Sequence, residues 1–405
     1  MEAYLGVDWS STEVVCAVGT ADGGVVRLGR VARTLEAAKA VIQRARDCCE
    51  GAEVHAIIEA GSMSWVWLFH AAGAVVHIVD PKQAARFAES LSSSGAKDDP
   101  RDACALVAFG RGRKLGAWTP PNEAQRRLER ALAQQEALTN KRSRETQQLR
   151  EDLKVTQPEL EDAIDELDAK WARALLKRVP TARHAQTLKR EALERIMSGA
   201  RRATIDRVWT ALQQPCIRTL TAFEAEDEAC TVRESLARLA QFDANLERVT
   251  TLIDHVLEAF EAAATIDAIP GIGTKLTAAV VAYGAVDGDR DASAVRMGAA
   301  PVFRGSGRTR DGQSKGVTVM RRSCSSAARR AVYMLGRAAV ANLPWARAQF
   351  AASKARGKRA GTAYRQVVRS LLRLINSLVH NRCAYDDARY VAGLKQRGVA
   401  WAAAL

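Results

Sequence analysis

Four carboxylates near the start of the chain have surroundings that suit metal ligands. Asp8 follows an apolar run in YLGVDWSSTEVVCAV (residues 4–18), and Glu59 ends a second run, HAIIE (residues 55–59). Asp99 and Asp102 occur together in KDDPRD (residues 97–102). Carboxylate oxygens bind hard divalent cations, and paired cations can stabilise both the attacking and the leaving oxygen at a phosphodiester. The set of four predicts a Mg²⁺ site for phosphoryl chemistry.

The second pair of acids allows more than one assignment. Asp99 and Asp102 are three residues apart, so both can project from one face at the start of a helix, where carboxylates are stabilised. They could equally serve as a cap and as a first-turn acid that complements the helix dipole. Asp98 could replace Asp99 as the ligand, because Asp98 and Asp102 also have helical spacing.

A serine in a basic, glycine-rich stretch is a candidate nucleophile. Ser306 lies between two glycines in AAPVFRGSGRTRDGQSKGVTVMRR (residues 299–322). Arginines beside it could lower the pKa of the hydroxyl group and bind the phosphoryl oxygens. No His or Asp near it has the pattern of a general base, so a flexible basic loop with an incidental serine is the alternative. The basic residues expected to contact nucleic acid here are Arg304, Arg308, Arg310, Lys315, Arg321 and Arg322.

A glycine-rich turn precedes this stretch. In IPGIGTKLTAAVVA (residues 269–282), Gly271 and Gly273 permit positive φ, and the apolar helix that follows begins near Lys275. Exposed amides at a helix start suit a backbone phosphate. The pattern is the helix-hairpin-helix signature, which holds DNA without reading its bases, although a glycine-rich turn alone is a generic feature.

The first 118 residues have the pattern of an α/β domain that could position the acids. A hairpin over residues 4–18 is followed by strands expected at 25–31, 54–59 and 74–79 and by helices at 34–49, 61–72 and 101–109. Strands separated by helices predict a largely parallel or mixed sheet covered on both faces. Such a hairpin, with one acid at the end of its first strand, is how an RNase H-like sheet begins.

Residues 119–405 are predicted to be helical and to form two parts. Residues 119–264 should form a scaffold of long helices, either an antiparallel pair within one chain or a coiled coil between protomers. One apolar stripe comprises Leu149, Leu153, Leu160, Ile164, Leu167, Trp171 and Leu175, and a second comprises Leu239, Phe242, Leu246, Val249, Ile253, Val256 and Phe260. Residues 265–405 should form a basic domain with the helix-hairpin-helix, the serine loop and helices at 323–341 and 360–379. Arginines on those two helices should lie along a nucleic-acid groove.

The distribution of charge supports a polyanionic partner. Residues 1–110 hold 10 Lys and Arg against 14 Asp and Glu, whereas residues 301–405 hold 21 against 3. The formal charge of +14 therefore comes from the C-terminal quarter, as expected of a phosphate-binding module. A basic surface kept for solubility is the alternative.

Cysteine spacing and hydropathy narrow the class of protein further. The eight cysteines form no CxxC pair and have no His at zinc spacing, so neither a zinc site nor a disulfide framework is predicted. The start of the chain has no signal-peptide pattern, and no uninterrupted apolar run approaches 18 residues. We therefore expect a cytoplasmic protein that does not span a membrane.

Taken together, these motifs resemble the IS-one-ten family of insertion-sequence transposases, the bridge-RNA-guided serine recombinases. The resemblance rests on GVDWSSTEVV, IIEAG, KDDPRDA, IPGIG…TAA and AAPVFRGSGRTR…MRRSC, which occur in the family's order over residues 3–110 and 265–345. It implies a RuvC-like domain whose Asp, Glu, Asp, Asp tetrad falls on Asp8, Glu59, Asp99 and Asp102. It also implies a C-terminal transposase domain whose nucleophile falls on Ser306, with Ser314 and Ser323 as alternatives.

The resemblance further implies partners and a reaction. An RNA encoded by the element would pair with donor and target DNA, and a homotetramer built from dimers would join the RuvC-like site of one protomer to the serine of another. Strand exchange would pass through 5′-phosphoserine intermediates. Such a protein would be bacterial and associated with the nucleoid when bound to DNA.

Three other functions compete with this interpretation. A metal-dependent nuclease or resolvase would use the same acids by hydrolysis, without a covalent step. A sugar kinase or actin-like ATPase also begins with a strand–Asp–turn–strand such as GVDWSST, but its further phosphate loops are missing here. An inert nucleic-acid scaffold would not need all four acids.

Overall fold

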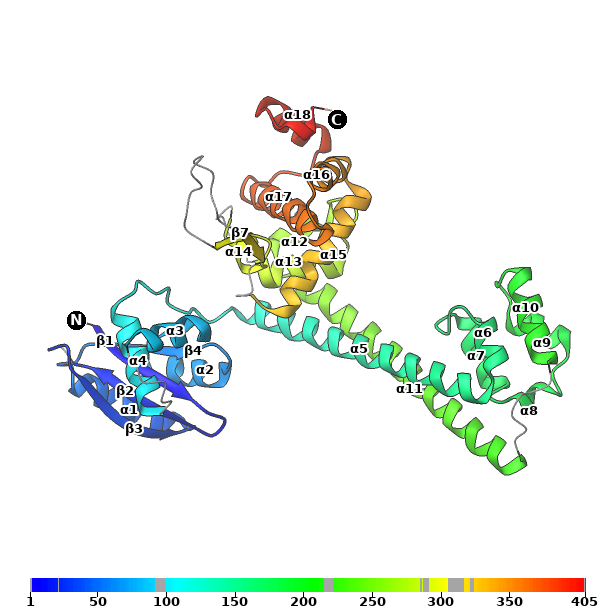
Figure 1. The fold of residues 1–405 in the computed structure, drawn as a ribbon, viewed down its shortest axis with the longest axis horizontal. Helices are drawn as coiled ribbons and strands as arrows, with labels where there is room; N and C mark the ends of the chain where they lie inside the picture. The colour runs from blue at the N-terminus through cyan, green and yellow to red at the C-terminus, as the bar shows by residue number, and fades with distance from the viewer. Residues whose placement is uncertain are drawn as a thin grey trace. The chain divides into compact units, whose positions relative to one another are not determined.

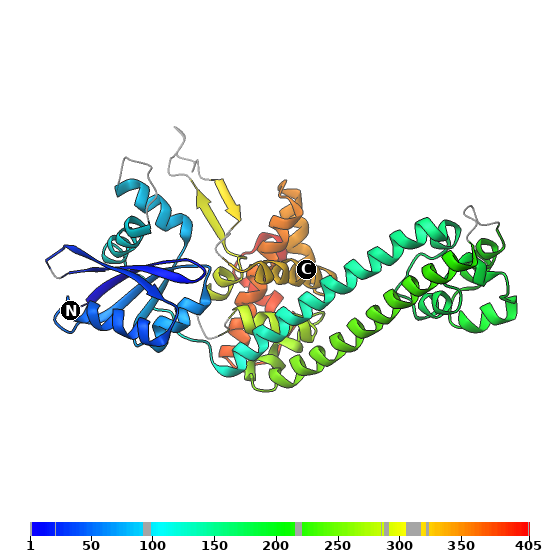
Figure 2. The same cartoon turned by 90° about the horizontal axis from the view of Figure 1, so that it is seen from below.

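The computed structural model describes residues 2–20, 22–91, 99–214, 221–284, 286, 291–304, 317–320, 324–403 and 405. The chain divides into two compact units, residues 1–122 and 123–405. Figures 1 and 2 show the elements of each unit from two directions.

Unit 1 is built on a five-stranded mixed sheet with the order β3-β2-β1-β4-β5. Strands β1 (Glu2–Trp9), β2 (Glu13–Gly19) and β3 (Val25–Ala32) form an antiparallel meander. Strands β4 (Glu53–Glu59) and β5 (Val75–Val79) extend the sheet parallel to β1. The predicted mixed sheet is confirmed, and its hairpin and strands lie within two residues of the expected ranges.

Helices cover both faces of this sheet. Helices α1 (Leu35–Asp47) and α2 (Met63–Ala71) pack on one face, over a core that includes Leu5, Val7 and Ile58. Thr34 caps α1 by accepting a hydrogen bond from the Ala37 amide at 3.2 Å. Helices α3 (Pro81–Leu91) and α4 (Asp99–Arg111) lie against the other face, where Ile57 belongs to a separate core.

An intrachain antiparallel helix pair, here called the arm, supports unit 2. It consists of α5 (Glu123–Thr156) and α11 (Ala222–Leu257). Cross-contacts fix its direction, since Gln135 bonds to Thr250 at 3.1 Å and Arg238 bonds to Glu145 at 2.9 Å. Of the two arrangements left open by the sequence, the structure therefore contains the pair within one chain.

The first apolar stripe does not continue along α5 as predicted. Pro158 follows the end of α5 and occupies the first turn of a new helix, because proline lacks the amide hydrogen needed to extend the old one. The second half of the stripe instead enters the core of a small helical module, here called the tip module (residues 157–213). Its helices are α6 (Pro158–Ala163), α7 (Lys170–Arg178), α8 (Ala182–Ala185), α9 (Arg190–Ile196) and α10 (Arg202–Gln213).

The other end of the arm packs in a second, larger apolar core. Most of that core comes from residues 261–403, which we call the helical body. Its helices are α12 (Glu261–Asp267), α13 (Thr274–Gly284), α14 (Ala292–Arg296), α15 (Ser326–Asn342), α16 (Pro344–Ala355), α17 (Ala360–His380) and α18 (Asp387–Gln396), followed by the short 3-10 helix η1 (Ala400–Ala402). The body also contains a two-stranded antiparallel ladder of β6 (Pro301–Arg304) and β7 (Val317–Met320). The all-helical expectation missed this ladder, whose strands are only four residues long.

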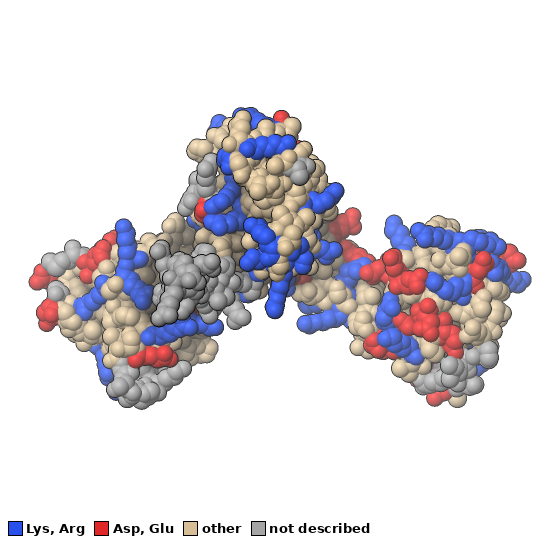
Figure 3. Space-filling model, turned by 45° about the horizontal axis from the view of Figure 1, so that its top comes forward, with Lys and Arg blue, Asp and Glu red and all other residues tan. Residues whose placement is uncertain are grey.

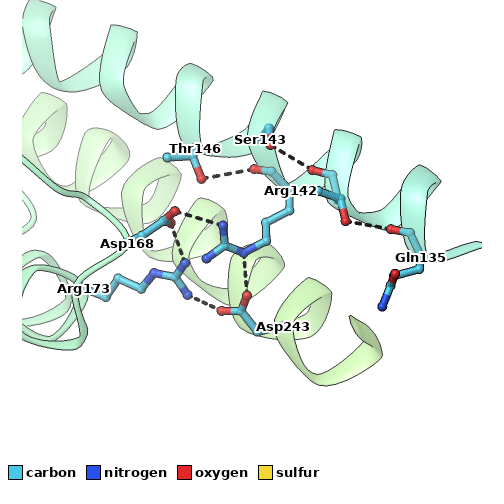
Figure 4. Close-up of polar contacts among 8 residues, drawn as sticks. Gln135, Arg142, Ser143, Thr146, Asp168, Arg173 and Asp243 are labelled. Carbon is cyan, nitrogen blue, oxygen red and sulfur yellow. Dashed lines mark hydrogen bonds and ion pairs between the residues drawn. The ribbon is translucent and has the colours of Figure 1, made fainter. Parts of the chain in front are cut away.

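Between its two cores the arm is held by charged groups (Figure 4). Arg142 of α5 donates to Asp243 of α11 at 2.6 Å and to Asp168 of the tip module at 2.9 Å. Arg173 of α7 bridges the same two carboxylates. Burial alone would raise the pKa of Asp243, but the hydrogen bonds from both arginines hold that pKa below its usual value. This four-residue network, the ionic quartet, joins α5, α11 and the tip module.

None of the helices in the described ranges has the length and hydropathy needed to cross a bilayer.

Candidate metal-binding and nucleic-acid sites

Asp8 and Glu59 lie at the same edge of the sheet. They follow Val7 and Ile58, which are paired across the parallel strands β1 and β4. Since parallel strands end at the same edge, the two acids occupy adjacent positions there. Both side chains are partly exposed. We call this end of the sheet the carboxyl edge.

The close approach of α4 places these acids beneath that helix. Gly6 has α4 so near that a Cβ on it would lie 2.0 Å from the carbonyl oxygen of Ala103. Asp8 is two residues beyond Gly6, so its side chain points to the same face of the sheet. Glu59 shares a face with Ile57, which lies against Gly110 of α4. Both acids therefore face α4.

The direction of α4 brings Asp99 and Asp102 to the same region. Ala103 lies over Gly6, whereas Gly110, seven residues later, lies against Tyr4. The helix thus runs opposite to β1, with its first turn towards the carboxyl edge. Asp102 immediately precedes Ala103, and Asp99 begins the helix one turn earlier. The fold gathers all four positions of the predicted tetrad at one end of one face.

The chemistry of these donors fits a hard divalent cation, because all four are carboxylates. Within the described ranges, no group of three or more His, Cys, Asp or Glu side chains has the arrangement of a metal site. The side chain of Asp99 and the whole of Asp98 lie outside the described residues. The assignment of the metal ligands therefore stays a prediction.

Two tryptophans and a glycine tie together the loops that follow Asp8 and Glu59. The Trp9 indole donates to the Glu59 carbonyl oxygen at 2.9 Å, and the Trp65 indole donates to the Ser10 carbonyl oxygen at 3.1 Å. Gly61 has φ of +145°, and a Cβ on it would lie 2.4 Å from the Trp9 ring. These contacts hold the backbone beside both acids. Sequence reasoning missed them, although a glycine so close to a strand end often marks a close approach.

The stretch predicted to form a helix-hairpin-helix contains α12, a turn and α13 in unit 2. Gly271 has φ of +82°, and a Cβ on it would lie 2.2 Å from the Asn342 side-chain nitrogen, so glycine is required there twice over. Gly271, Gly273 and Lys275 are exposed, whereas Ile272 between them is buried. The start of α13 therefore presents amides and one lysine to the solvent, as a phosphate contact requires.

The predicted nucleophile falls on the connection between β6 and β7. Ser306, Arg308, Arg310, Ser314 and Lys315 lie outside the described residues, as do Arg321, Arg322 and Ser323. The backbone of Arg304 ends β6, but its side chain is not described. At the base of the ladder, Gly298 (φ of +78°) lies so close to Cys324 that a Cβ would be 2.5 Å from the sulfur. That contact holds the two ends of the β6–β7 segment side by side.

Several arginines of the helical body have acidic partners. Arg369 and Arg373 of α17 both bond to Asp291, and Arg330 of α15 pairs with Glu136 of α5. The expected row of arginines on α17 is therefore partly neutralised within the chain. Figure 3 nevertheless shows Lys and Arg gathered over the helical body, whereas basic and acidic side chains mix on the tip module.

A five-stranded mixed sheet with helices on both faces and acids at one edge agrees with an RNase H-like domain of the nuclease type. Comparison with known sequences makes this specific. A sequence model of the DEDD_Tnp_IS110 family, described as a transposase, matches residues 5–158. Over those residues, which are less than half of the chain, the sequence is similar to the DEDD transposase domain of the IS110 family, which is the IS-one-ten family that its motifs resemble.

A longer alignment reaches beyond that domain. The chain is 29% identical over 232 residues to a protein named "Putative transposase y4uE" from Sinorhizobium fredii (strain NBRC 101917 / NGR234). The alignment covers 55% of this chain and 62% of the relative, so the chain spans less than two thirds of the length of that protein.

Proposed function

We propose that this protein is an RNA-guided DNA transposase that cuts and rejoins donor and target DNA through a covalent phosphoserine intermediate. The observation that supports this most is the convergence of Asp8, Glu59 and the first turn of α4 at the carboxyl edge, within the span that matches the DEDD family. The +18 net charge of residues 301–405, from 21 basic and 3 acidic residues, supplies a surface for phosphates.

In this proposal the four acids share one task. Asp8, Glu59, Asp99 and Asp102 would hold Mg²⁺, which stabilises the negative charge that develops on the oxygens of a reacting phosphate. Trp9, Trp65 and Gly61 would keep the loops beside Asp8 and Glu59 in place through the contacts described above. Pre-organisation of this kind lowers the cost of ordering the ligands when the cation and DNA bind.

Ser306 would be the nucleophile. Its hydroxyl oxygen would form a bond to phosphorus while the bond from phosphorus to the 3′ oxygen breaks, and the proton would pass to that oxygen. The products are a 3′ hydroxyl and a 5′-phosphoserine ester. Attack by the 3′ hydroxyl of another strand would restore a phosphodiester and release Ser306 without hydrolysis. Arg304, Arg308 and Arg310 would bind the non-bridging oxygens of that phosphate.

The partners follow from the same proposal. Donor and target DNA would contact the helix-hairpin-helix, through Gly271, Gly273 and Lys275, and the basic residues Lys315, Arg321 and Arg322. An element-encoded bridge RNA would choose the DNA sequences by base pairing. A homotetramer would bring the carboxyl edge of one protomer to Ser306 of another.

The decisive experiment is a denaturing-gel assay for a covalent protein–DNA adduct. The protein would be incubated with the RNA encoded beside its element, donor and target DNA, and Mg²⁺. Wild type would be compared with Ser306→Ala and Asp8→Asn, and with Asp22→Asn as a matched control, since Asp22 is an exposed acid of the β2–β3 turn. We expect an adduct with wild type and Asp22→Asn, and none with the other two variants.

Other outcomes would redirect the proposal. An adduct that survives Ser306→Ala would move the nucleophile, with Ser314→Ala and Ser323→Ala as the next variants. Cleaved DNA without any adduct, abolished by Asp8→Asn, would establish the second candidate, a hydrolytic RuvC-like endonuclease or resolvase. That candidate uses the same carboxyl edge and needs no serine.

A further inference from the structure

The turn between α16 and α17, here called the basic turn (residues 354–359), carries four exposed cations. They are Lys354, Arg356, Lys358 and Arg359. Within the described part of the chain, none of the four forms a salt bridge. The helices α15, α16 and α17 around the turn cannot supply a partner, because residues 312–385 hold 15 Lys and Arg and no Asp or Glu. The basic turn therefore attracts anions from outside the chain.

Hydrogen bonds hold the basic turn in one conformation. Gly357 has φ of +73°, and its amide donates to the Lys354 carbonyl oxygen at 2.9 Å. The Lys358 amide donates to the Ser353 carbonyl oxygen at 3.2 Å, so the end of α16 is closed by a Schellman motif. The side chain of Ser353 is buried and donates to Gln366 of α17 at 2.7 Å. The backbone that carries the cations is thus fixed before a ligand arrives.

Three aromatic side chains meet beside this turn, one from each of the packed helices α15, α16 and α17 (Figure 1). Phe350 and Tyr364 have ring centroids 4.7 Å apart, and those of Tyr333 and Tyr364 are 5.3 Å apart. Phe350 lies near the end of α16 and Tyr364 near the start of α17, so both are roughly 8 Å or less along their helices from the basic turn. Gly336 lets α15 approach, since a Cβ there would lie 2.8 Å from the Tyr364 side chain.

Tyr333 presents its ring to the solvent at the edge of this aromatic cluster. The residue is 48% exposed, whereas Phe350 and Tyr364 are half-buried. The rings of Tyr333 and Tyr364 are nearly perpendicular, at 82°, so Tyr364 does not stack on Tyr333. Arg337, one turn further along α15, is also exposed. An aromatic ring open to stacking therefore lies in a surface that contains cations and no acids.

This combination fits unpaired nucleotides better than a duplex. Sites for single-stranded nucleic acid combine cations that follow the phosphates with aromatic rings on which bases stack. In a duplex the bases already stack on one another, so a duplex would use the cations and leave the Tyr333 ring without a partner. An unpaired strand uses both.

We propose that the basic turn and the aromatic cluster form a binding site for unpaired nucleotides, in which Tyr333 stacks on a base and the four cations bind the neighbouring phosphates. The inference rests on the proposed function, because it takes nucleic acid as the ligand. It adds a site for an unpaired strand to the DNA contacts assigned to the turn before α13.

The test is fluorescence anisotropy with the full chain and three labelled probes. These are a single strand of mixed sequence as DNA, the same strand as RNA, and the corresponding DNA duplex. Tyr333→Ala should weaken binding of single strands about fivefold to hundredfold, the share that stacking on one ring supplies, and should change duplex binding by less than about twofold. Phe223→Ala is the matched control, since Phe223 is a more exposed aromatic residue of α11, and it should leave all three affinities unchanged.

Two further variants separate stacking from packing. Tyr333→Phe keeps the ring and should bind all probes as the wild type does. Tyr333→Leu keeps an apolar side chain beside Tyr364 but has no ring, so it should lose single-strand affinity as Tyr333→Ala does. Single-strand binding by Tyr333→Leu at the wild-type level would overturn the inference, as would equal losses for single strands and duplex in Tyr333→Ala.

A matched pair of charge variants tests the basic turn. Lys358→Gln/Arg359→Gln removes two cations, and the Arg359 side chain makes no capping hydrogen bond that would be lost. The slope of log affinity against log salt for single strands should decrease in magnitude by about 1.4, or about 0.7 for each lost phosphate contact. The control Lys177→Gln/Arg178→Gln removes an exposed Lys-Arg pair of α7 and should keep the wild-type slope. Equal slopes for both variants would overturn the assignment of the turn.

The two proposals can fail separately. If the wild type binds neither strand nor duplex, the proposed function loses its nucleic-acid ligand and the inference fails with it. If the wild type binds single strands and Tyr333→Ala binds them equally well, only the inference fails. Dependence on the ring with the RNA strand, the DNA strand or both would support the inference and identify the source of the unpaired nucleotides.

Discussion

Gly6 decides where the first turn of α4 lies. The chain has a glycine in the middle of a buried strand, which normally weakens a strand, and the reason is the carbonyl oxygen of Ala103 above it. Any side chain at this position would push α4 away from β1. Because Asp102 belongs to the first turn of that helix and Asp8 follows in β1, the movement would separate acids that the proposed metal site requires together.

We therefore expect Gly6→Ala to affect both stability and chemistry. The added methyl group should cost about 1–3 kcal/mol of unfolding free energy, as overpacking does. Mg²⁺-dependent DNA cleavage should fall by more than DNA affinity, since the basic surface is in unit 2. Gly116→Ala is the matched control, because a Cβ there meets nothing within 4 Å. Thermal unfolding and cleavage assays on both variants would check this, and an unaffected Tm for Gly6→Ala would contradict it.

At the scale of elements, the ionic quartet adds a charged connection between the tip module and the arm, beside the apolar core that they share. Gln135, Arg142 and Glu145 of α5 all make polar contacts to α11 in the stretch between the two apolar cores. Such a stretch contributes less hydrophobic burial than a coiled-coil seam does. The alignment of α5 on α11 in this stretch depends on pairs of charged side chains, so the stability of the junction should change with pH.

Asp243→Asn should loosen this junction. We expect a loss of about 1–2 kcal/mol of unfolding free energy, kept low because the Asp243 side chain is 41% exposed and the solvent screens its charge. The folded-state pKa of Asp243 lies below its unfolded value, so this stability is present above about pH 4 and is lost as the pH falls further. Circular-dichroism melts at pH 7 and pH 3 would show a smaller difference for Asp243→Asn than for wild type.

Asp254→Asn is the control for that experiment, because Asp254 is an exposed acid of the same helix. Its melts should match those of the wild type at both pH values. If Asp243→Asn and Asp254→Asn showed the same difference between the melts at pH 7 and pH 3, the quartet would add nothing specific to the junction.

Periodicity predicted the elements of unit 1 well, because each strand or helix there has a single apolar face and clear boundaries. It failed at residue 156, where the spacing of Leu160 and Ile164 continues the helical stripe although Pro158 ends the helix. It also missed β6 and β7, which are too short to show an alternating pattern. The positions of the acids could be predicted from strand ends, but the roles of Gly6, Trp9 and Tyr333 depend on contacts between distant segments, which no local pattern contains.

At the scale of the whole molecule, the two units differ in the charged residues that the proposed function needs. The acidic residues that would hold a metal ion lie in unit 1, and the basic excess lies in residues 301–405 of unit 2. DNA affinity should therefore come from unit 2 and depend strongly on salt. If about six to ten phosphates are contacted, affinity should fall about 10³- to 10⁵-fold between 50 and 200 mM salt. Anisotropy titrations over that range would check this, and a flat dependence would exclude a large phosphate-binding surface.

The antiparallel course of the arm has a practical consequence. The chain leaves α5 after Thr156 and re-enters α11 at Ala222, and both points are at the same end of the helix pair. The segment between them packs with the adjoining ends of α5 and α11 in an apolar core that is separate from that of the helical body. An engineer could exchange this segment for a short connecting loop or for a foreign domain with neighbouring termini, provided that the apolar side chains of α5 and α11 that it covers are made polar, while β6, β7 and the carboxyl edge keep their supporting contacts. The arm is thus a natural attachment point for cargo.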